Sequence, residues 1–175
     1  MKLSVCAVAV VASLAGIGCK LGNTTSASSD ILISTDKVLY LATSSPPSAS
    51  SFMSYRFTVV LRVQNLGTKT VTLDRCFPDS PTPRFSIVAT EGGKTVQSAF
   101  EPIWGCVAHD SPIILAPGTV GLYTLNLVGP TVRDNGQTVG SLSGRLRILP
   151  AISFGDGTSP KDAPVSNAFD VQLGT

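Results

Sequence analysis

Apolar and polar residues alternate along much of the chain after residue 30, and this period of two is typical of half-buried β-strands. The clearest case is residues 54–65, SYRFTVVLRVQN, in which every second residue from Tyr55 to Val63 is apolar. The positions between them include Arg56 and Arg62. We therefore predict a strand over 54–65 with one face in the core and the other face in solvent.

Similar patterns predict further strands in the rest of the chain. They cover residues 31–42, with a kink at Thr35 and Asp36, and residues 70–73, 84–90, 94–100, 112–115, 119–128, 141–149 and 167–173. Residues 43–51 are predicted to form a loop, because Pro46 and Pro47 cannot donate hydrogen bonds to a neighbouring strand. A slip in the alternation near Tyr123 indicates a β-bulge.

Short turn sequences predict how these strands pair. The turn at 65–69, NLGTK, is expected to return the chain so that 70–73 pairs with 54–65. Hairpins are also expected at two other turns, between 84–90 and 94–100 and between 112–115 and 119–128. Eight or nine short strands without an amphipathic helix predict an all-β domain, an immunoglobulin-like antiparallel β-sandwich over residues 30–175.

The N-terminus has the pattern of a secretory signal peptide, with Lys2 before an apolar run over residues 3–17. That run is shorter than the roughly 20 residues needed to cross a bilayer. Its end, Gly-Ile-Gly-Cys at 16–19, resembles a bacterial lipobox, although Gly16 stands where the motif usually has leucine. The resemblance implies a lipoprotein signal peptide over 1–18 and a lipid on Cys19. Ordinary signal-peptidase cleavage, which leaves Cys19 as a free thiol, is the alternative.

The number of cysteines favours lipidation. The chain has four cysteines, and Cys6 leaves with the leader. If Cys19 carries a lipid, Cys76 and Cys106 remain as one pair, whereas a free Cys19 would be an odd thiol in an oxidising compartment. A disulfide between Cys76 and Cys106 closes a loop of 30 residues. Such a loop adds roughly 3 to 4 kcal/mol of stability on the chain-entropy estimate.

Residues 19–29 are small and polar and are expected to form a flexible tether that spans roughly 15 to 20 Å. We therefore expect an exported protein that is held at a bacterial membrane by its N-terminal lipid. Lys20, directly after the cysteine, is by resemblance compatible with the outer membrane or the cell surface. A soluble secreted or periplasmic protein is the alternative.

Composition supports the fold class and excludes one class of partner. Charged residues make up 14% of the chain, against roughly 25% in typical soluble proteins. The 16 glycines and 12 prolines suit short strands and turns better than helices. A net charge of +2 provides no basic footprint for nucleic acid.

The candidate chemistry is sparse, and we predict no catalytic residue, cofactor or metal. His109, Asp110 and Ser111 are consecutive, and three consecutive residues cannot point at one another as a catalytic triad requires. Acidic loop residues such as Asp134, Asp156 and Asp162 lack the spacing of a calcium-binding EF-hand.

Trp104 and His109 form a possible binding surface near Cys106. Trp104 is either an exposed platform for a sugar or a protein partner, or a core residue that packs against the disulfide.

Three segments, RFTVVLRVQNLGTKTVTL, RFSIVATEGGKTV and IILAPG, resemble the strands and turns of BsuPI-type domains, which are named for an intracellular proteinase inhibitor. The resemblance covers somewhat under half of the chain. It implies a sandwich fold and, as an alternative function, inhibition of a proteinase through an exposed loop. The main expectation is a lipid-anchored envelope protein that acts as a non-enzymatic interaction or structural module with a protein partner.

Overall fold

The computed structural model describes residues 30–45, 54–102, 111–132, 138–139 and 145–174. Within these ranges the chain contains strands and turns but no helix, and so no helix that could span a membrane. The strands are β1 (Ile31–Thr35), β2 (Leu39–Ser45), β3 (Ser54–Asn65), β4 (Val71–Leu73), β5 (Phe85–Glu91), β6 (Lys94–Gln97), β7 (Glu101–Pro102), β8 (Ile113–Leu115), β9 (Val120–Gly129), β10 (Thr131–Val132), β11 (Thr138–Val139), β12 (Arg145–Pro150), β13 (Ile152–Phe154) and β14 (Asp170–Leu173). The predicted all-β class is confirmed, with more strands than the eight or nine expected.

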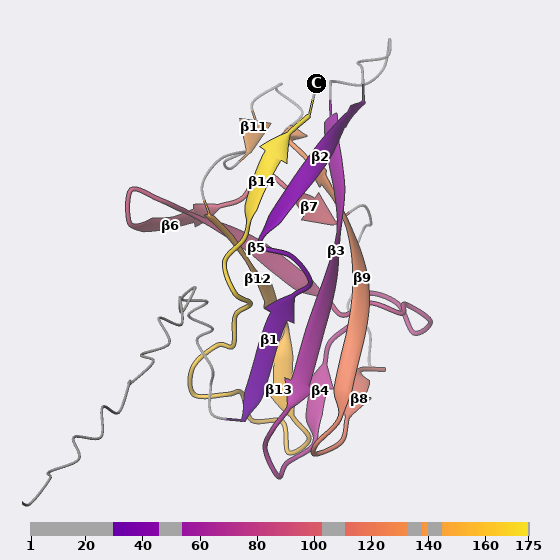
Figure 1. The fold of residues 1–175 in the computed structure, drawn as a ribbon. Coiled ribbons are helices and arrows are strands. Elements are labelled where there is room, and N and C mark those ends of the chain that lie inside the picture. The colour runs from indigo at the N-terminus through magenta and orange to yellow at the C-terminus, as the bar shows by residue number, and fades with distance from the viewer. Residues whose placement is uncertain (1–29, 46–53, 103–110, 133–137, 140–144, 175) are drawn as a thin grey trace, which may run out of the picture.

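The first layer is a sheet in the order β14-β2-β3-β9-β7, and β1 also pairs with β3. Its centre is the long antiparallel pair of β3 and β9, which lie side by side in Figure 1. This pairing runs without interruption from Tyr55 opposite Gly129 to Gln64 opposite Val120.

The second layer contains two three-stranded sheets, β12-β5-β6 and β13-β4-β8, and in Figure 1 its strand β5 passes behind β3. They are joined at Ala151, whose amide donates to the carbonyl of Arg84 (2.9 Å) and whose carbonyl accepts from the amide of Asp74 (3.0 Å). The run 145–154 therefore pairs first with β5 and then with β4. The two layers together give the protein a sandwich-like architecture.

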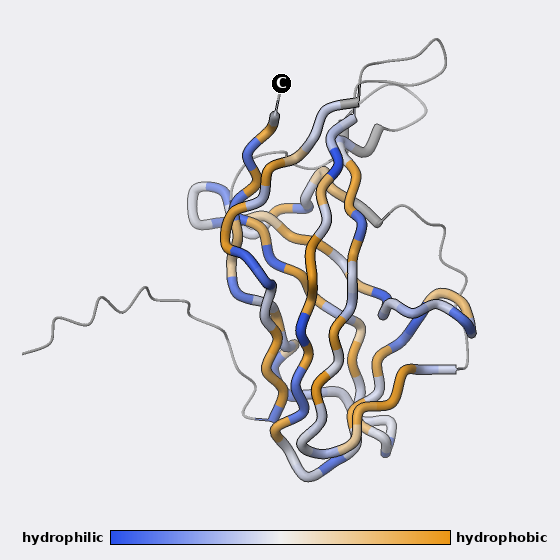
Figure 2. Tube along the Cα trace, turned by 45° about the vertical axis from the view of Figure 1, so that its right-hand side comes forward, coloured by the Kyte–Doolittle hydropathy of each residue, from blue (hydrophilic) through white to orange (hydrophobic). Residues whose placement is uncertain are grey.

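The core lies between the layers and is built by the expected alternation. In β3, Phe57, Val59, Leu61 and Val63 are all buried, as predicted. In the second layer the buried residues include Ile87, Ala89, Leu146 and Ile148. Orange and paler or blue segments alternate along the long strands in Figure 2, which is the same pattern seen as hydropathy. Burial of this alternating face supplies the main stabilisation of the sandwich.

The predicted kink between 31–35 and 39–45 is confirmed. β1 pairs with residues 61–65 of β3, and β2 pairs with residues 54–56. Between them, the Asp36 carboxylate accepts hydrogen bonds from the Tyr40 hydroxyl (2.7 Å) and the Val60 amide (2.8 Å). Partial burial opposes ionisation of Asp36, but these hydrogen bonds outweigh it and hold its pKa below the usual value. Burial, and then the bond to Asp36, raise the pKa of Tyr40.

Two of the predicted hairpins are wrong, because their turns carry the chain from one layer to the other. β4 pairs with β8 and β13 rather than with β3, and β8 pairs with β4 rather than with β9. The third predicted hairpin, β5 with β6, is confirmed, and Gly92 and Gly93 provide its turn with φ values of +54° and +80°. These left-handed angles suit glycine, which has no Cβ.

The predicted bulge near Tyr123 is also wrong. The register of β9 with β3 continues through this position, and Tyr123 points into the core at 7% exposure. The alternation slips because Val120 and Leu122, both apolar, lie on the solvent face. The Tyr123 side chain lies over Gly121 and leaves no room there for a Cβ.

The last strand departs from the antiparallel arrangement that the sequence predicted. β14 pairs with β2 in parallel, with Asp170 opposite Leu39 and Leu173 opposite Ala42. Phe169 before it is fully buried, whereas Leu173 is 38% exposed and not a core residue. β14 extends the first layer beyond β2 in Figure 1.

Candidate functional site

Most of the residues singled out from the sequence lie outside the described part of the chain. These are Cys19, Trp104, Cys106 and His109. Cys76 is described, and it is buried, with 2% exposure, near the start of loop 74–84. The lipid on Cys19, the bond between Cys76 and Cys106 and the binding surface at Trp104 and His109 therefore stay predictions.

Loop 74–84 is held in shape by its own polar groups. The Arg75 guanidinium donates to the carbonyls of Ser111 and Ser80, and the Ser80 amide donates to the Phe77 carbonyl (3.0 Å). This last bond closes a turn at the tip of the loop. Phe77 at that turn is 44% exposed, so the loop presents an aromatic side chain to solvent.

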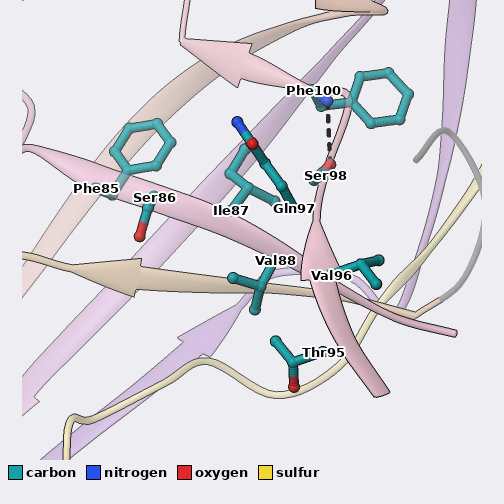
Figure 3. A pocket seen from close by; sticks show the side chains of 9 residues that line it. All are labelled: Phe85, Ser86, Ile87, Val88, Thr95, Val96, Gln97, Ser98 and Phe100. Carbon is teal, nitrogen blue, oxygen red and sulfur yellow. Dashed lines mark hydrogen bonds between the residues drawn. The ribbon is translucent and has the colours of Figure 1, made fainter. Parts of the chain in front are cut away.

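A hollow of about 550 Å³ opens where β6 separates from β5. Figure 3 shows the side chains that line it. They are Phe85, Ser86, Ile87 and Val88 from β5, Thr95, Val96 and Gln97 from β6, and Ser98 and Phe100 from the segment that leads to β7.

Local hydrogen bonds explain why the chain leaves the sheet here. The Ser98 amide donates to the Ile87 carbonyl (3.2 Å) just beyond the end of β6. The Ser98 hydroxyl then accepts from the Phe100 amide (3.1 Å) and turns the chain into the core (Figure 3). Because Phe100 is buried between the layers, the crossing segment diverges from β5 and leaves the hollow open.

The hollow combines an apolar lining with polar groups that are free to bind. Ile87 and Phe100 are buried on its inner side, and Val88 and Val96 are half-buried. Ser86, Thr95 and Gln97 are exposed, and their side chains make no hydrogen bond with another described residue. The lining contains no ionisable side chain. Such a site suits an apolar side chain together with neutral hydrogen-bonding groups, for example peptide groups.

Sequence reasoning missed this site. It predicted one straight strand over 94–100, whereas β6 ends at Gln97 and the chain turns at Ser98. Ser98 inside an otherwise strand-like run was the available signal, because serine side chains bond to nearby backbone groups and end strands.

The acidic residues considered for calcium are placed differently from one another. Asp134 lies outside the described ranges. Asp156 lies in a surface turn, where its carboxylate accepts from the Lys69 ammonium (2.8 Å) and from Thr158. The hydrogen bond from Lys69 is the main cause that lowers the pKa of Asp156. Among the described residues, no cluster of three or more His, Cys, Asp or Glu side chains could hold a metal ion.

No family model and no curated protein matches the chain. Among solved structures, the Northeast Structural Genomics Consortium target SoR45 is similar, with a TM-score of 0.42 and 15% sequence identity. The match covers 80% of this chain and 84% of the other.

Proposed function

We propose that this protein is a lipid-anchored component of the bacterial cell envelope whose immunoglobulin-like sandwich is a non-enzymatic interaction module. The observation that carries the proposal is the hollow beside β5 and β6, with its apolar lining and its unbonded Ser86, Thr95 and Gln97. The disulfide between Cys76 and Cys106 belongs to the proposal as a clamp on the loops.

The lining indicates what kind of partner the hollow accepts. An apolar side chain of the partner fits against Val88 and replaces water there, while backbone amides of the same segment bond to Gln97 and Ser86, which share the face of Val88. The partner is therefore a protein segment with an exposed apolar residue. Trp104 and His109 remain a second candidate surface.

A photo-crosslinking residue at Gln97 tests the hollow in living cells. We expect it to form a specific protein adduct, because Gln97 is exposed at the rim of the hollow. Val88→Lys in the same chain is expected to abolish the adduct, since it places a charge in the apolar lining. The same crosslinker at Thr158, in an exposed turn, is the matched control. Equal labelling at Gln97 and Thr158 would contradict the proposal.

Cys19→Ser tests the anchor separately. In cells fed a clickable fatty acid, we expect the wild-type chain to carry the label and to fractionate with membranes. The variant is expected to lose the label and to become soluble, because Cys19 is the proposed site of the acyl chains that stable anchoring requires. Mass spectrometry of the wild-type N-terminus provides the direct measurement. An unmodified Cys19 thiol there would rule out the lipid anchor.

Proteinase inhibition is the alternative function, and loop 74–84 is the described loop that best meets its requirement. The loop is fixed by Arg75 and presents Phe77, which is 44% exposed, at its turn. A titration against a panel of proteinases, with Phe77→Ala as the matched variant, distinguishes this function from the interaction module.

A further inference from the structure

The solvent face of the first layer carries apolar and basic side chains where exposed strands usually carry polar ones. We call the outward-pointing residues Leu39, Leu41, Arg56, Arg62, Val120 and Leu122 of β2, β3 and β9 the basic-apolar face. Leu41 and Leu122 are the most exposed large apolar residues in the described chain, at 65% and 66%. By register, Arg62 lies opposite Leu122, so a positive charge and an apolar group lie side by side.

The two arginines of this face have no carboxylate partner among the described residues, because the ion pairs there are Lys69 with Asp156 and Arg145 with Asp170. The nearby Asp36 carboxylate is already bonded to Tyr40 and Val60. Acidic residues occupy the borders of the face: Asp79 lies in the loop beside β9, Glu101 stands opposite Val128 in the edge strand β7, and Asp170 stands opposite Leu39 in β14, where it pairs with Arg145. Lys37, exposed at the kink, adds a further positive charge on the β2 side. The carboxylates thus lie at the borders of the face, and the two arginines within it are available to anionic groups.

The proposed tether reaches the fold at one end of this same sheet. The Asp30 carbonyl, directly after the tether, accepts hydrogen bonds from the amides of Leu66 (2.7 Å) and Gly67 (3.0 Å). Ile31 lies opposite Asn65, and the neighbouring Gln64 lies opposite Val120. The chain thus enters the domain beside the Val120 end of the basic-apolar face, and a tether of roughly 15 to 20 Å keeps this face within reach of the bilayer.

We propose that the basic-apolar face lies against an anionic bilayer surface, with the arginines at lipid phosphates and the leucines in the interface. This inference rests on the proposed lipid anchor. A sheet face that mixes arginine and leucine matches the interfacial region, which accepts both kinds of side chain. The hollow beside β5 and β6 belongs to the other layer, so protein binding and membrane contact use different surfaces.

Co-sedimentation of the unlipidated Cys19→Ser chain with vesicles tests this inference without relying on the anchor. We expect binding to vesicles of phosphatidylglycerol and phosphatidylcholine in equal amounts, and much less binding to phosphatidylcholine alone. Each arginine near an anionic surface strengthens partitioning about fivefold, so Arg56→Gln with Arg62→Gln is expected to weaken it about 25-fold. Leu122→Ser is expected to weaken vesicle binding several-fold. Added salt is also expected to weaken vesicle binding, because it screens the arginine charges.

The matched control is the double variant Arg84→Gln with Arg147→Gln in and beside the β12-β5-β6 sheet, which removes the same charge from the second layer and leaves the ion pair of Arg145 with Asp170 in place. It is expected to bind vesicles within about twofold of the Cys19→Ser chain, because bilayer contact does not involve its face. Equal binding to the two vesicle types, or equal losses in both double variants, would overturn the inference. Binding of a leucine-glutamate peptide to the face, without vesicle binding, would overturn it in favour of an acidic protein partner. Mass spectrometry measures acylation of Cys19 independently of vesicle binding. The lipid anchor and the bilayer contact of the basic-apolar face can therefore be disproved separately.

Discussion

Replacing Phe169 with alanine is expected to lower the free energy of unfolding by about 3 to 5 kcal/mol. Phe169 is fully buried, and its ring packs edge-on against Tyr40 with centroids 5.2 Å apart. Its amide and carbonyl pair with Leu146 of β12, so the residue connects the two layers. Truncation would leave a cavity at this junction, because its neighbours Tyr40 and Leu146 are fixed by hydrogen bonds and strand pairing.

Urea denaturation of the Cys19→Ser chain measures this loss. Leu173→Ala is the matched control, since Leu173 lies four residues later but is 38% exposed. We expect Leu173→Ala to lower the free energy of unfolding by less than about 1.5 kcal/mol, because it removes less apolar surface from the core. A loss of less than about 1 kcal/mol for Phe169→Ala would show that the junction is not part of the cooperative core.

Replacing Asn65 with leucine is expected to lower the free energy of unfolding by about 2 to 5 kcal/mol. Each buried polar group that the substitution leaves without a partner destabilises the fold by about 1 to 3 kcal/mol. Asn65 is 1% exposed, and its side-chain amide donates to the carbonyls of Lys69 (2.8 Å) and Leu115 (3.0 Å). Its side-chain oxygen accepts from the Gly67 amide (3.1 Å). Leucine has a similar volume but can make none of these bonds.

Asn126→Leu provides the comparison, since Asn126 lies on the exposed face of β9 and bonds there only to Thr58 (3.0 Å) among the described side chains. Asn126→Leu is expected to change the free energy of unfolding by no more than about 0.5 kcal/mol. Thermal and urea unfolding of both variants measure the difference. Equal stability of the Asn65 and Asn126 variants would mean that the buried amide does not hold the two turns together.

The strands could be predicted where burial alternates cleanly. β3 begins and ends at the residues that its alternation predicts, because one of its faces is core along the whole strand. Asp36 could be identified as a kink partly for a local reason, since its carboxylate accepts a hydrogen bond from the Tyr40 hydroxyl four residues later, although the Val60 amide that it also bonds lies far along the chain. Strand existence therefore depends on short-range information, which a single sequence contains.

Strand pairing depended on information that the sequence does not show locally. A turn such as 65–69 looks the same whether the chain stays in one sheet or crosses to the other, and Asn65 decides this through contacts with Lys69 and Leu115. Val120 and Leu122 gave a false bulge because apolar residues on a solvent face mimic core residues.

The candidate site was predictable only in small part. Cys76 is buried, but the other residues named from the sequence lie outside the described ranges. The hollow beside β6 arises because a strand ends early and Phe100 crosses to the core. Its lining comes from three successive segments, so no motif with a fixed spacing marks it.

The parallel pairing of β14 with β2 also affects the rate of folding. Residues 39–42 can pair only once residues 170–173, far later in the sequence, are available. Contacts between such distant parts of a sequence raise the contact order and slow folding. The first layer is therefore completed only after its last strand, β14, has joined β2.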